Sequence, residues 1–299
     1  MMKIKIKRNM NKKITISYKT NNILIDKLSK QDNIEILKDA NFLLKLFSKK
    51  KYADVYFHSG NLDENSIDNI LNAKMTITNC FSSMNEIIAK TKISHDKIKV
   101  IYPSIDIEYK KNKDVKEKLC EELQIDTKNK IILFTAKNFK TSGIKEFLDI
   151  CSSISYEEFK VIVAGKKQQI RSLQFQIPKY QKLQDKIILL EDYKNMDDLF
   201  LASDKFILPT YNKSFSTNVA KAMFCRCAVF LSIDNDAKEI VDVFASMDSP
   251  TDSAMSFKLD AVLNGKDDLK LIKKDNRKLA SEFSLENNLA KFNSIMDNI

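Results

Sequence analysis

At 299 residues, the chain is long enough for one large or two modest domains, each with a hydrophobic core of its own. Its composition is 43% hydrophobic, but no apolar run approaches the roughly twenty residues that span a bilayer, and the basic N-terminus lacks a signal peptide's apolar segment. We therefore expect a globular, cytoplasmic protein. The five cysteines are scattered, which fits reduced thiols and predicts no metal site (Cys80, Cys120, Cys151, Cys225 and Cys227).

The net charge of +10 is concentrated at the N-terminus, because residues 1–51 contain fourteen Lys or Arg against four Asp or Glu. Within this segment, apolar residues recur at helical spacing and predict an amphipathic helix that packs on a sheet (Ile36, Leu37, Ala40, Leu43, Leu44 and Phe47). Its lysines are either solvated or face an anionic membrane, where each would contribute roughly 1 kcal/mol. Nucleic acid is disfavoured as a partner, because no RNA-binding aromatic motif, zinc finger or helix-turn-helix signature is present.

Short apolar runs alternate with helical patterns along most of the chain, which predicts two α/β units. The expected strands of the first unit are 13–18, 54–57, 75–78 and 98–101. Those of the second unit are 131–135, 160–164, 187–190, 206–208 and 228–231. Pro103 interrupts the pattern and a lysine-rich stretch follows it, so we expect the boundary at 102–106.

The stretch 202–241 carries the densest set of signals. A strand over 205–208 is stopped by Pro209, and a strand over 228–231 follows a buried helix. The helix is marked by a candidate N-cap, Ser214 or Ser216, and by Phe215, Val219, Ala222 and Met223 at helical spacing. A further helix is expected to open at Asn235 and end near Phe244. This is the repeating unit of a parallel sheet, which binds ligands at the carboxyl ends of its strands.

Several kinds of chemistry are disfavoured. The chain has no G-x-G-x-x-G motif and no P-loop, and four glycines leave few places for the backbone to approach a phosphate. His58 and His95 lie far apart with no nucleophile motif around them, which argues against a hydrolase triad. Asp197 and Asp198 are interpreted as solvated residues on a polar helix face rather than as a catalytic pair.

Several segments occur in the order and spacing of a known family. They are 99–106 (KVIYPSID), 134–147 (FTAKNFKTSGIKEF), 161–165 (VIVAG), 196–210 (MDDLFLASDKFILPT), 215–223 and 238–241. Residues 284–292 (SLENNLAKF) are similar to the family's closing helix. Over roughly residues 97–298, the chain resembles the retaining GT-B glycosyltransferases, which include enzymes of sucrose and lipopolysaccharide-core synthesis.

The resemblance implies an α/β fold with two Rossmann-like parallel-sheet domains, an N-terminal one for the acceptor and a C-terminal one for a nucleotide-sugar donor. It implies no cofactor and no metal, since the nucleotide-sugar is a substrate. We expect the domains to be 1–102, which is short for this family, and 103–283, followed by a closing helix at 284–299.

The resemblance also places a donor site in the second domain. By position it comprises Lys137, Lys140, Ser142, Gly143, Gly165, Lys213, Phe215, Ser216, Lys221 and Glu239. Lys137 keeps a cation for the donor diphosphate, and Lys140 could replace a missing second one. The family's glycines in a later loop match Asn235 and Asp236, so their loss is expected to crowd the site and add an acid near the diphosphate.

The largest departure is at Lys213 and Lys221, where the family has two glutamates that bear on the donor sugar and ribose. A carboxylate accepts hydrogen bonds from hydroxyl groups, whereas an ammonium can only donate them. Both lysines are either ordinary surface residues of a site that has lost its function, or an anion site at a helix N-terminus.

Two functions remain open at this point. One is an active glycosyltransferase at the inner face of a membrane, acting on a glycan or lipid-linked acceptor, with Lys213 and His58 as candidate catalytic residues. His58 follows a strand (ADVYFH) that resembles one of the family's, and its alternative role is that of a satisfied loop histidine. The other function is a catalytically degenerate relative that binds or regulates a partner glycosyltransferase.

Overall fold

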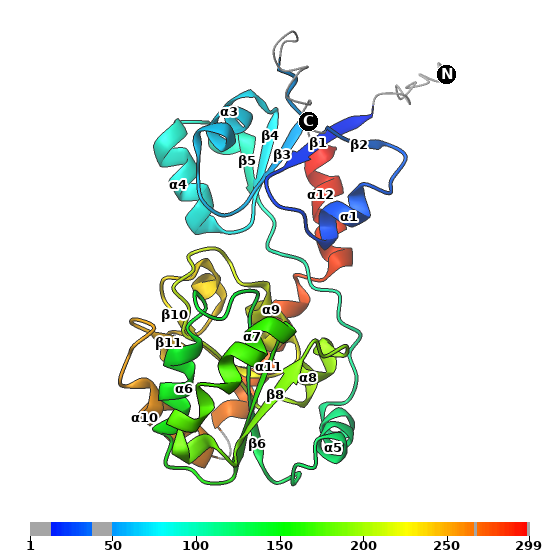
Figure 1. Cartoon of the computed structure of the whole chain (residues 1–299). Coiled ribbons are helices and arrows are strands. Elements are labelled where there is room, and N and C mark those ends of the chain that lie inside the picture. Colours follow the sequence, from blue (N-terminus) through cyan, green and yellow to red (C-terminus); the bar gives the residue numbers. More distant parts are fainter. Residues whose placement is uncertain (1–12, 38–49, 266–267, 298–299) are drawn as a thin grey trace, which may run out of the picture. The chain divides into compact units, whose positions relative to one another are not determined.

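The structure is a computed structural model that describes residues 13–37, 50–265 and 268–297. These residues form two compact units (Figure 1). The first contains the described residues up to Ser104 together with those from Leu285 onward, and the second runs from Ile105 to Ser284. Each unit is an α/β structure built on a parallel sheet, which confirms the predicted fold class.

The first unit has a five-stranded sheet in the order β2-β1-β3-β4-β5, and every neighbouring pair is parallel. The strands are β1 (Ile14–Tyr18), β2 (Ile34–Ile36), β3 (Val55–His58), β4 (Met75–Thr78) and β5 (Ile98–Val100). The helices are α1 (Ile23–Leu28), α3 (Glu64–Asn72), α4 (Phe81–Thr91) and α12 (Leu285–Met296), with a short 3-10 helix at His95–Lys97.

Adjacent residues of β3 point to opposite faces of this sheet and belong to two separate cores. Phe57 lies in the core formed with α1 and α12, where its ring stacks on that of Phe292 with centroids 5.8 Å apart. Tyr56 lies in the core under α3 and α4, with Ile70 and Ile87. The C-terminal helix therefore returns to cover a sheet that the N-terminal part of the chain begins, as Figure 1 shows for α12 beside α1.

The prediction of an amphipathic helix that begins at Ile36 is wrong for its first residue. Ile36 ends β2, a three-residue strand whose residue Ile34 pairs with Ile14 of β1. Ile34 is buried and Glu35 is exposed, so this edge strand follows the alternation of a sheet rather than the spacing of a helix. The other apolar positions, from Ala40 to Phe47, lie outside the described residues.

The second unit has a six-stranded, fully parallel sheet in the order β11-β10-β9-β6-β7-β8. The strands are β6 (Lys130–Thr135), β7 (Phe159–Gly165), β8 (Ile187–Glu191), β9 (Lys205–Leu208), β10 (Ala228–Ser232) and β11 (Ser246–Met247). The helices are α5 (Asn112–Glu122), α6 (Ile144–Ser152), α7 (Lys167–Gln174), α8 (Met196–Ala202), α9 (Thr217–Phe224), α10 (Met255–Asn264) and α11 (Asp268–Ser281).

The central strands of this sheet are almost continuous runs of buried residues, because helices cover both faces. The five strands predicted for this unit are confirmed, and so are the four predicted for the first. The helix predicted from Asn235 to Phe244 is wrong. Its place is taken by two 3-10 helices, Asp236–Ile240 and Val243–Ala245, followed by the short strand β11.

No helix among the described residues is long and apolar enough to cross a membrane. All five cysteines are buried, and none of them forms a disulfide bond. The part of the chain that the structure describes holds no group of three His, Cys, Asp or Glu side chains placed to bind a metal ion.

Candidate active site

The strand order of each sheet marks one edge as a place for ligands. In the second sheet the chain moves outward from β6 to β7 and β8, and then returns to the other side of β6 through β9. Because the loops after β6 and β9 diverge to opposite faces, a crevice for ligands is expected outside the carboxyl ends of these two strands. The loops concerned are 136–143 and 209–216, which contain most of the residues that the sequence assigned to the donor site.

Gly143 sets the distance between these two loops. It caps α6 in the left-handed conformation, with φ +77°, and lies directly against the backbone of Pro209. A β-carbon at this position would be 1.7 Å from the carbonyl oxygen of Pro209, so no side chain fits. Glycine is required here both by its backbone conformation and by the close approach of the second loop.

Hydrogen bonds join the same two loops on either side of this contact. The backbone amide of Tyr211 donates to the carbonyl oxygen of Thr141 over 3.0 Å. The Asn212 side-chain amide lies 3.2 Å from the Thr141 hydroxyl and 3.3 Å from the buried hydroxyl of Ser142. The two loops are therefore held as one surface rather than as independent segments.

Asn235, which follows β10, holds the loop 209–216 in place through hydrogen bonds. Its side chain is 1% exposed and donates to the carbonyl oxygens of Asn212 (2.8 Å) and Ser214 (2.7 Å). Its Oδ1 accepts from the backbone amides of Ser216 (3.2 Å) and Ala237 (3.0 Å). All four polar contacts of the side chain are made within the protein, so Asn235 positions the loop.

This arrangement corrects the expectation that Asn235 and Asp236 crowd the site. The Asn235 side chain is turned into the protein, and Asp236 is 7% exposed while its backbone amide donates to the carbonyl oxygen of Lys213. Residue spacing could not reveal this role, because the partners of Asn235 lie 21 and 23 positions earlier in the chain.

Three lysines stand on the two loops. Lys137 and Lys140 are exposed after β6, and within the described residues their ammonium groups make no ion pair. Lys213 is exposed on the loop after β9. Gln169 of α7 supports the first loop, because it accepts from the Phe139 amide (2.7 Å) and donates to the Lys137 carbonyl oxygen (3.2 Å).

Lys221 does not lie with the other three lysines. It is placed inside α9, where its ammonium pairs with Asp197 of α8 at 3.0 Å. Asp198 likewise pairs with Lys110 at 2.7 Å, so both aspartates interpreted as solvated are ion-paired. The second of the two substituted positions therefore has a structural partner of its own.

The remaining predicted donor residues surround the same edge. Ser216 is the N-cap of α9, Phe215 is buried beneath the loop, and Glu239 is half-buried on the first 3-10 helix after β10. Gly165 ends β7 against the ring of Phe139, whose nearest atom would lie 2.3 Å from an added β-carbon. Gly165 therefore leaves room for the Phe139 ring of the neighbouring loop, rather than exposing its backbone amide to a ligand.

The first sheet has a corresponding reversal between β1 and β3, and polar atoms without partners gather at its carboxyl end. Five buried side-chain atoms in the described residues have no hydrogen-bond partner, and four belong to strands of this sheet or the residue after one. They are Ser17 Oγ, His58 Nδ1, Thr78 Oγ1 and Asn79 Oδ1. In register, Ser17 aligns with Tyr56 and His58 with Thr78, so three of the four residues lie on one face of adjacent strands.

His58 is the central residue of this set. Its ring is 3% exposed, and Nε2 lies 3.2 Å from the carbonyl oxygen of Gly60, to which it can donate. Nδ1 is then an unprotonated acceptor with nothing to accept from. Burial, together with the nearby Lys19 ammonium, lowers the pKa of His58 from 6.5 to about 4, so the ring is neutral at physiological pH.

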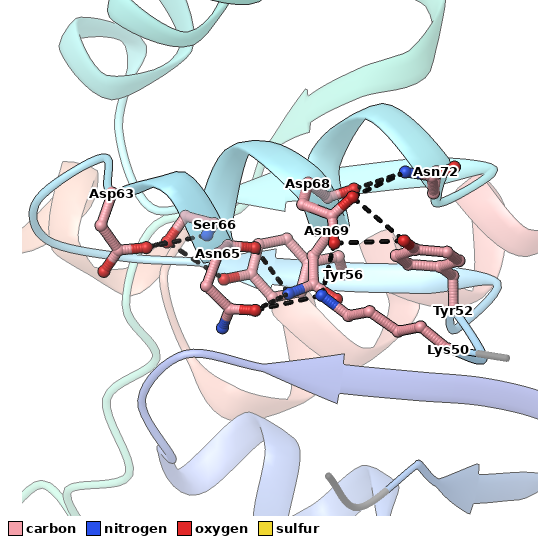
Figure 2. A network of polar contacts seen from close by, with 9 residues as sticks. All are labelled: Lys50, Tyr52, Tyr56, Asp63, Asn65, Ser66, Asp68, Asn69 and Asn72. Carbon is pink, nitrogen blue, oxygen red and sulfur yellow. Dashed lines mark hydrogen bonds and ion pairs between the residues drawn. The ribbon is translucent and has the colours of Figure 1, made fainter. Parts of the chain in front are cut away.

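A polar network joins α3 to the segment before β3 (Figure 2). Asp63 caps the helix by accepting from the backbone amide and hydroxyl of Ser66, and its carboxylate also pairs with Lys19. Farther along α3, Asp68 accepts from the Tyr52 hydroxyl and pairs with Lys50. These contacts fix the segment before β3 and the loop after it, and thereby fix His58.

The low pKa of His58 predicts a loss of stability in acid. Between pH 6.5 and about 4 the unfolded chain binds a proton that the native ring refuses, so the free energy of unfolding falls as the pH falls through this window. The loss reaches at most about 3 kcal/mol at the lower end, and none is expected above pH 6.5. Urea unfolding followed by circular dichroism at pH 7.5 and 4.5 should show a smaller change for His58→Asn than for the unsubstituted chain. Equal changes would contradict the burial argument.

Comparison with known proteins identifies a family whose model matches this sequence. A family model described as "Glycosyl transferases group 1" matches residues 115–279. No curated protein sequence matches the chain significantly. Three solved structures share the fold over most of the chain. Anabaena HepE in complex with UDP and glucose has 15% identity, covers 82% of this chain and 71% of its own, and has a TM-score of 0.67.

The second structure is a glycosyltransferase from Rickettsia africae, with 17% identity, coverage of 92% of this chain and 80% of its own, and a TM-score of 0.69. The third is WaaG, a glycosyltransferase involved in lipopolysaccharide biosynthesis, with 11% identity, coverage of 93% and 98%, and a TM-score of 0.65. At these identities the likeness concerns the fold, including the described part of the first unit.

Proposed function

The chain belongs to the group 1 glycosyl transferases, and we propose that it moves a sugar from a nucleotide-sugar donor to a glycan or lipid-linked acceptor in surface polysaccharide or glycoconjugate synthesis. The observation that carries the proposal is the surface formed by loops 136–143 and 209–216 at the strand-order reversal of the second sheet. HepE, which has the same fold, was solved in complex with UDP and glucose.

On this proposal the donor diphosphate lies against the two loops. Lys137 and Lys140 supply positive charge from the first loop, and Lys213 supplies it from the second, where α9 begins. A helix N-terminus and lysine side chains together form a favourable anion site, and these charges would stabilise the nucleotide diphosphate as it leaves. Lysine is a point charge without the bidentate geometry of arginine, so we expect weaker donor binding than an arginine site would give.

The acceptor is proposed to bind the first unit beside His58. The unpartnered polar atoms of His58 and Thr78 mark the carboxyl ends of β3 and β4, the edge of a parallel sheet at which ligands bind. A neutral imidazole is also able to take a proton from a hydroxyl group, which is the role expected of His58 if it is catalytic.

A non-catalytic relative that binds a partner glycosyltransferase is the second candidate. The observation that favours it is the ion pair between Lys221 and Asp197, because a residue matching a family acid is here committed to joining α8 and α9. Contact between the basic segment 1–51 and an anionic membrane stays a prediction, since much of that segment lies outside the described residues.

Nucleotide binding tests the proposed donor site directly. A nucleotide-sugar held at one hundred times its dissociation constant should stabilise the protein by about 2.7 kcal/mol, which a thermal-shift measurement detects easily. Lys137→Met and Lys213→Met should each weaken binding by roughly 10- to 100-fold, as expected for loss of a charge-assisted hydrogen bond. Lys118→Met, at an exposed lysine of α5, is the matched control and should bind normally.

If none of the UDP-, GDP-, ADP- and CMP-sugars and no free nucleotide shifts the transition, the donor site is not where we place it. If a donor binds but is neither transferred nor hydrolysed, the non-catalytic relative is the correct alternative. Transfer that is lost in His58→Asn while donor binding is kept would assign the acceptor side to the first unit.

A further inference from the structure

Lys205 is a buried residue whose ammonium group has no carboxylate of its own among the described residues. It is the first residue of β9 and is 3% exposed, although lysine is rarely buried without a partner. Its register partners are Ile132 of β6 and Ala228 of β10, so it lies at the amino end of the middle of the sheet. Within the described residues its ammonium takes part in no hydrogen bond and no ion pair.

The carboxylate of Asp204, which favours the charged form of Lys205, is already committed to other groups. Asp204 accepts from the Lys116 ammonium at 2.9 Å and from the backbone amide of Ile131 at 3.0 Å. The ammonium of Lys273, on α11, lies 4.0 Å from its other oxygen. The single negative charge of Asp204 is therefore already shared by the ammonium groups of Lys116 and Lys273.

The other charged groups that act on Lys205 are cations. Lys273 approaches from α11, and Lys130 begins β6 on the same face of the sheet as Ile132, the register partner of Lys205. Cys227, which precedes β10, donates to the carbonyl oxygens of Phe200 and Ser203, and burial raises the pKa of its thiol to about 12. The thiol is thus neutral, so the groups that act on Lys205 comprise one carboxylate, that of Asp204, and the two ammonium groups of Lys273 and Lys130.

The excess of positive charge near Lys205 affects the protonation of its amine. Burial, followed by repulsion from Lys273, lowers the pKa of Lys205 from 10.5 to about 7. The amine is then divided between its neutral and charged forms near neutral pH, and a nearby anion would draw the equilibrium to the charged form. Binding of an anion would accordingly take up protons from solution.

We propose that Lys205, Lys273 and Lys130 form a binding site for a phosphate-class oxyanion at the amino end of the second sheet. A tetrahedral oxyanion can accept hydrogen bonds from three ammonium groups, and those of Lys130, Lys205 and Lys273 come from three different elements, β6, β9 and α11. Carboxylate ligands would gain less, because they carry one negative charge against the excess of cations. The ligand is either inorganic phosphate or the phosphoryl group of a larger molecule.

The site is independent of the proposed transferase function. Lys205 and Lys130 begin β9 and β6, whereas the loops 136–143 and 209–216 follow the ends of the same strands. An anion at the amino end would bind the second unit without occupying the donor surface.

Calorimetric titration of the full chain with sulfate tests the proposal, because sulfate does not itself titrate near neutral pH. We expect binding at pH 6 and pH 7 with net proton uptake, measured in two buffers of different ionisation enthalpy. Affinity should weaken about fivefold between pH 7 and pH 8, as the unliganded amine loses its proton. Inorganic phosphate and a sugar phosphate are then compared: tighter binding of the sugar phosphate indicates a phosphorylated metabolite, and tighter binding of phosphate indicates the free ion.

Two substitutions locate the sulfate. Lys205→Met keeps the length of the buried stem and should abolish the proton uptake and weaken binding by at least roughly tenfold. Lys273→Met, at a partly exposed residue, should weaken it by a similar factor and serves if Lys205→Met does not fold. Lys118→Met, at an exposed lysine of α5 that belongs to neither proposed site, should bind sulfate normally. The proposal is overturned if no sulfate binds, if Lys205→Met and Lys273→Met bind it normally, or if Lys137→Met alone abolishes binding.

Discussion

Replacing Gly143 with alanine is expected to lower the free energy of unfolding of the second unit by roughly 2 to 5 kcal/mol. The left-handed backbone at φ +77° costs an alanine about 1–2 kcal/mol, and forcing a β-carbon against the Pro209 carbonyl oxygen adds about 1–3 kcal/mol. Because the chain has no tryptophan, urea unfolding is best followed by circular dichroism. Donor binding should fall as well, since the substitution pushes the two loops apart.

Gly265→Ala is the matched control for this substitution. Gly265 has an ordinary negative φ of −77°, and an added β-carbon would lie 3.2 Å from the nearest atom, the carbonyl oxygen of Ala261. A change within about 1 kcal/mol is expected there. If Gly143→Ala were as mild as Gly265→Ala and bound donor normally, the close contact between the loops would not be a feature of the protein.

The strands could be predicted because each is a short, nearly continuous apolar run bounded by punctuation, which is the pattern of strands covered on both faces. β2 and β11 escaped prediction for a physical reason. With three and two residues they are too short for a period to show, and they exist because they lie at the edges of sheets that other strands establish. Tertiary pairing, rather than local propensity, determines their structure.

The site was predicted less completely than the fold. The family resemblance pointed to the lysines of both loops, but it could not show that Lys221 is turned to Asp197 while Lys213 stays on the loop. Nor could the residue types show the unpaired ammonium of Lys205, which reads in sequence as the polar first residue of an apolar strand. Contacts between residues far apart in the chain decide all three cases.

Asn235 shows how a position that departs from the family pattern can still preserve the site. Where the family has a glycine that leaves room for the donor, this chain has a side chain that is withdrawn into the protein and bonded to the loop. The loop 209–216 is thereby held without any contribution from a bound ligand. On the proposed function, the departures at this edge change which charges face the donor.

Replacing Asn235 with aspartate is expected to destabilise the second unit by about 3–5 kcal/mol and to abolish donor binding. The substitution keeps the size of the side chain and the oxygen that accepts from Ser216 and Ala237. It exchanges the donating amide for an oxygen that faces the carbonyl oxygens of Asn212 and Ser214 at 2.8 and 2.7 Å, and it buries a charge without a partner. The loop must move away, and Lys213 moves with it.

Asn218→Asp separates this effect from a general intolerance of new charge, because Asn218 is half-buried and donates one hydrogen bond, to the Thr135 carbonyl oxygen at 3.0 Å. A loss of about 1–2 kcal/mol is expected there. The deficit of Asn235→Asp should also shrink between pH 7 and pH 4, since protonation of the introduced carboxyl group restores one donor, whereas a cavity or a backbone strain would not respond to pH. Equal losses in the two variants, or a deficit independent of pH, would mean that Asn235 does not hold the loop through its donated hydrogen bonds.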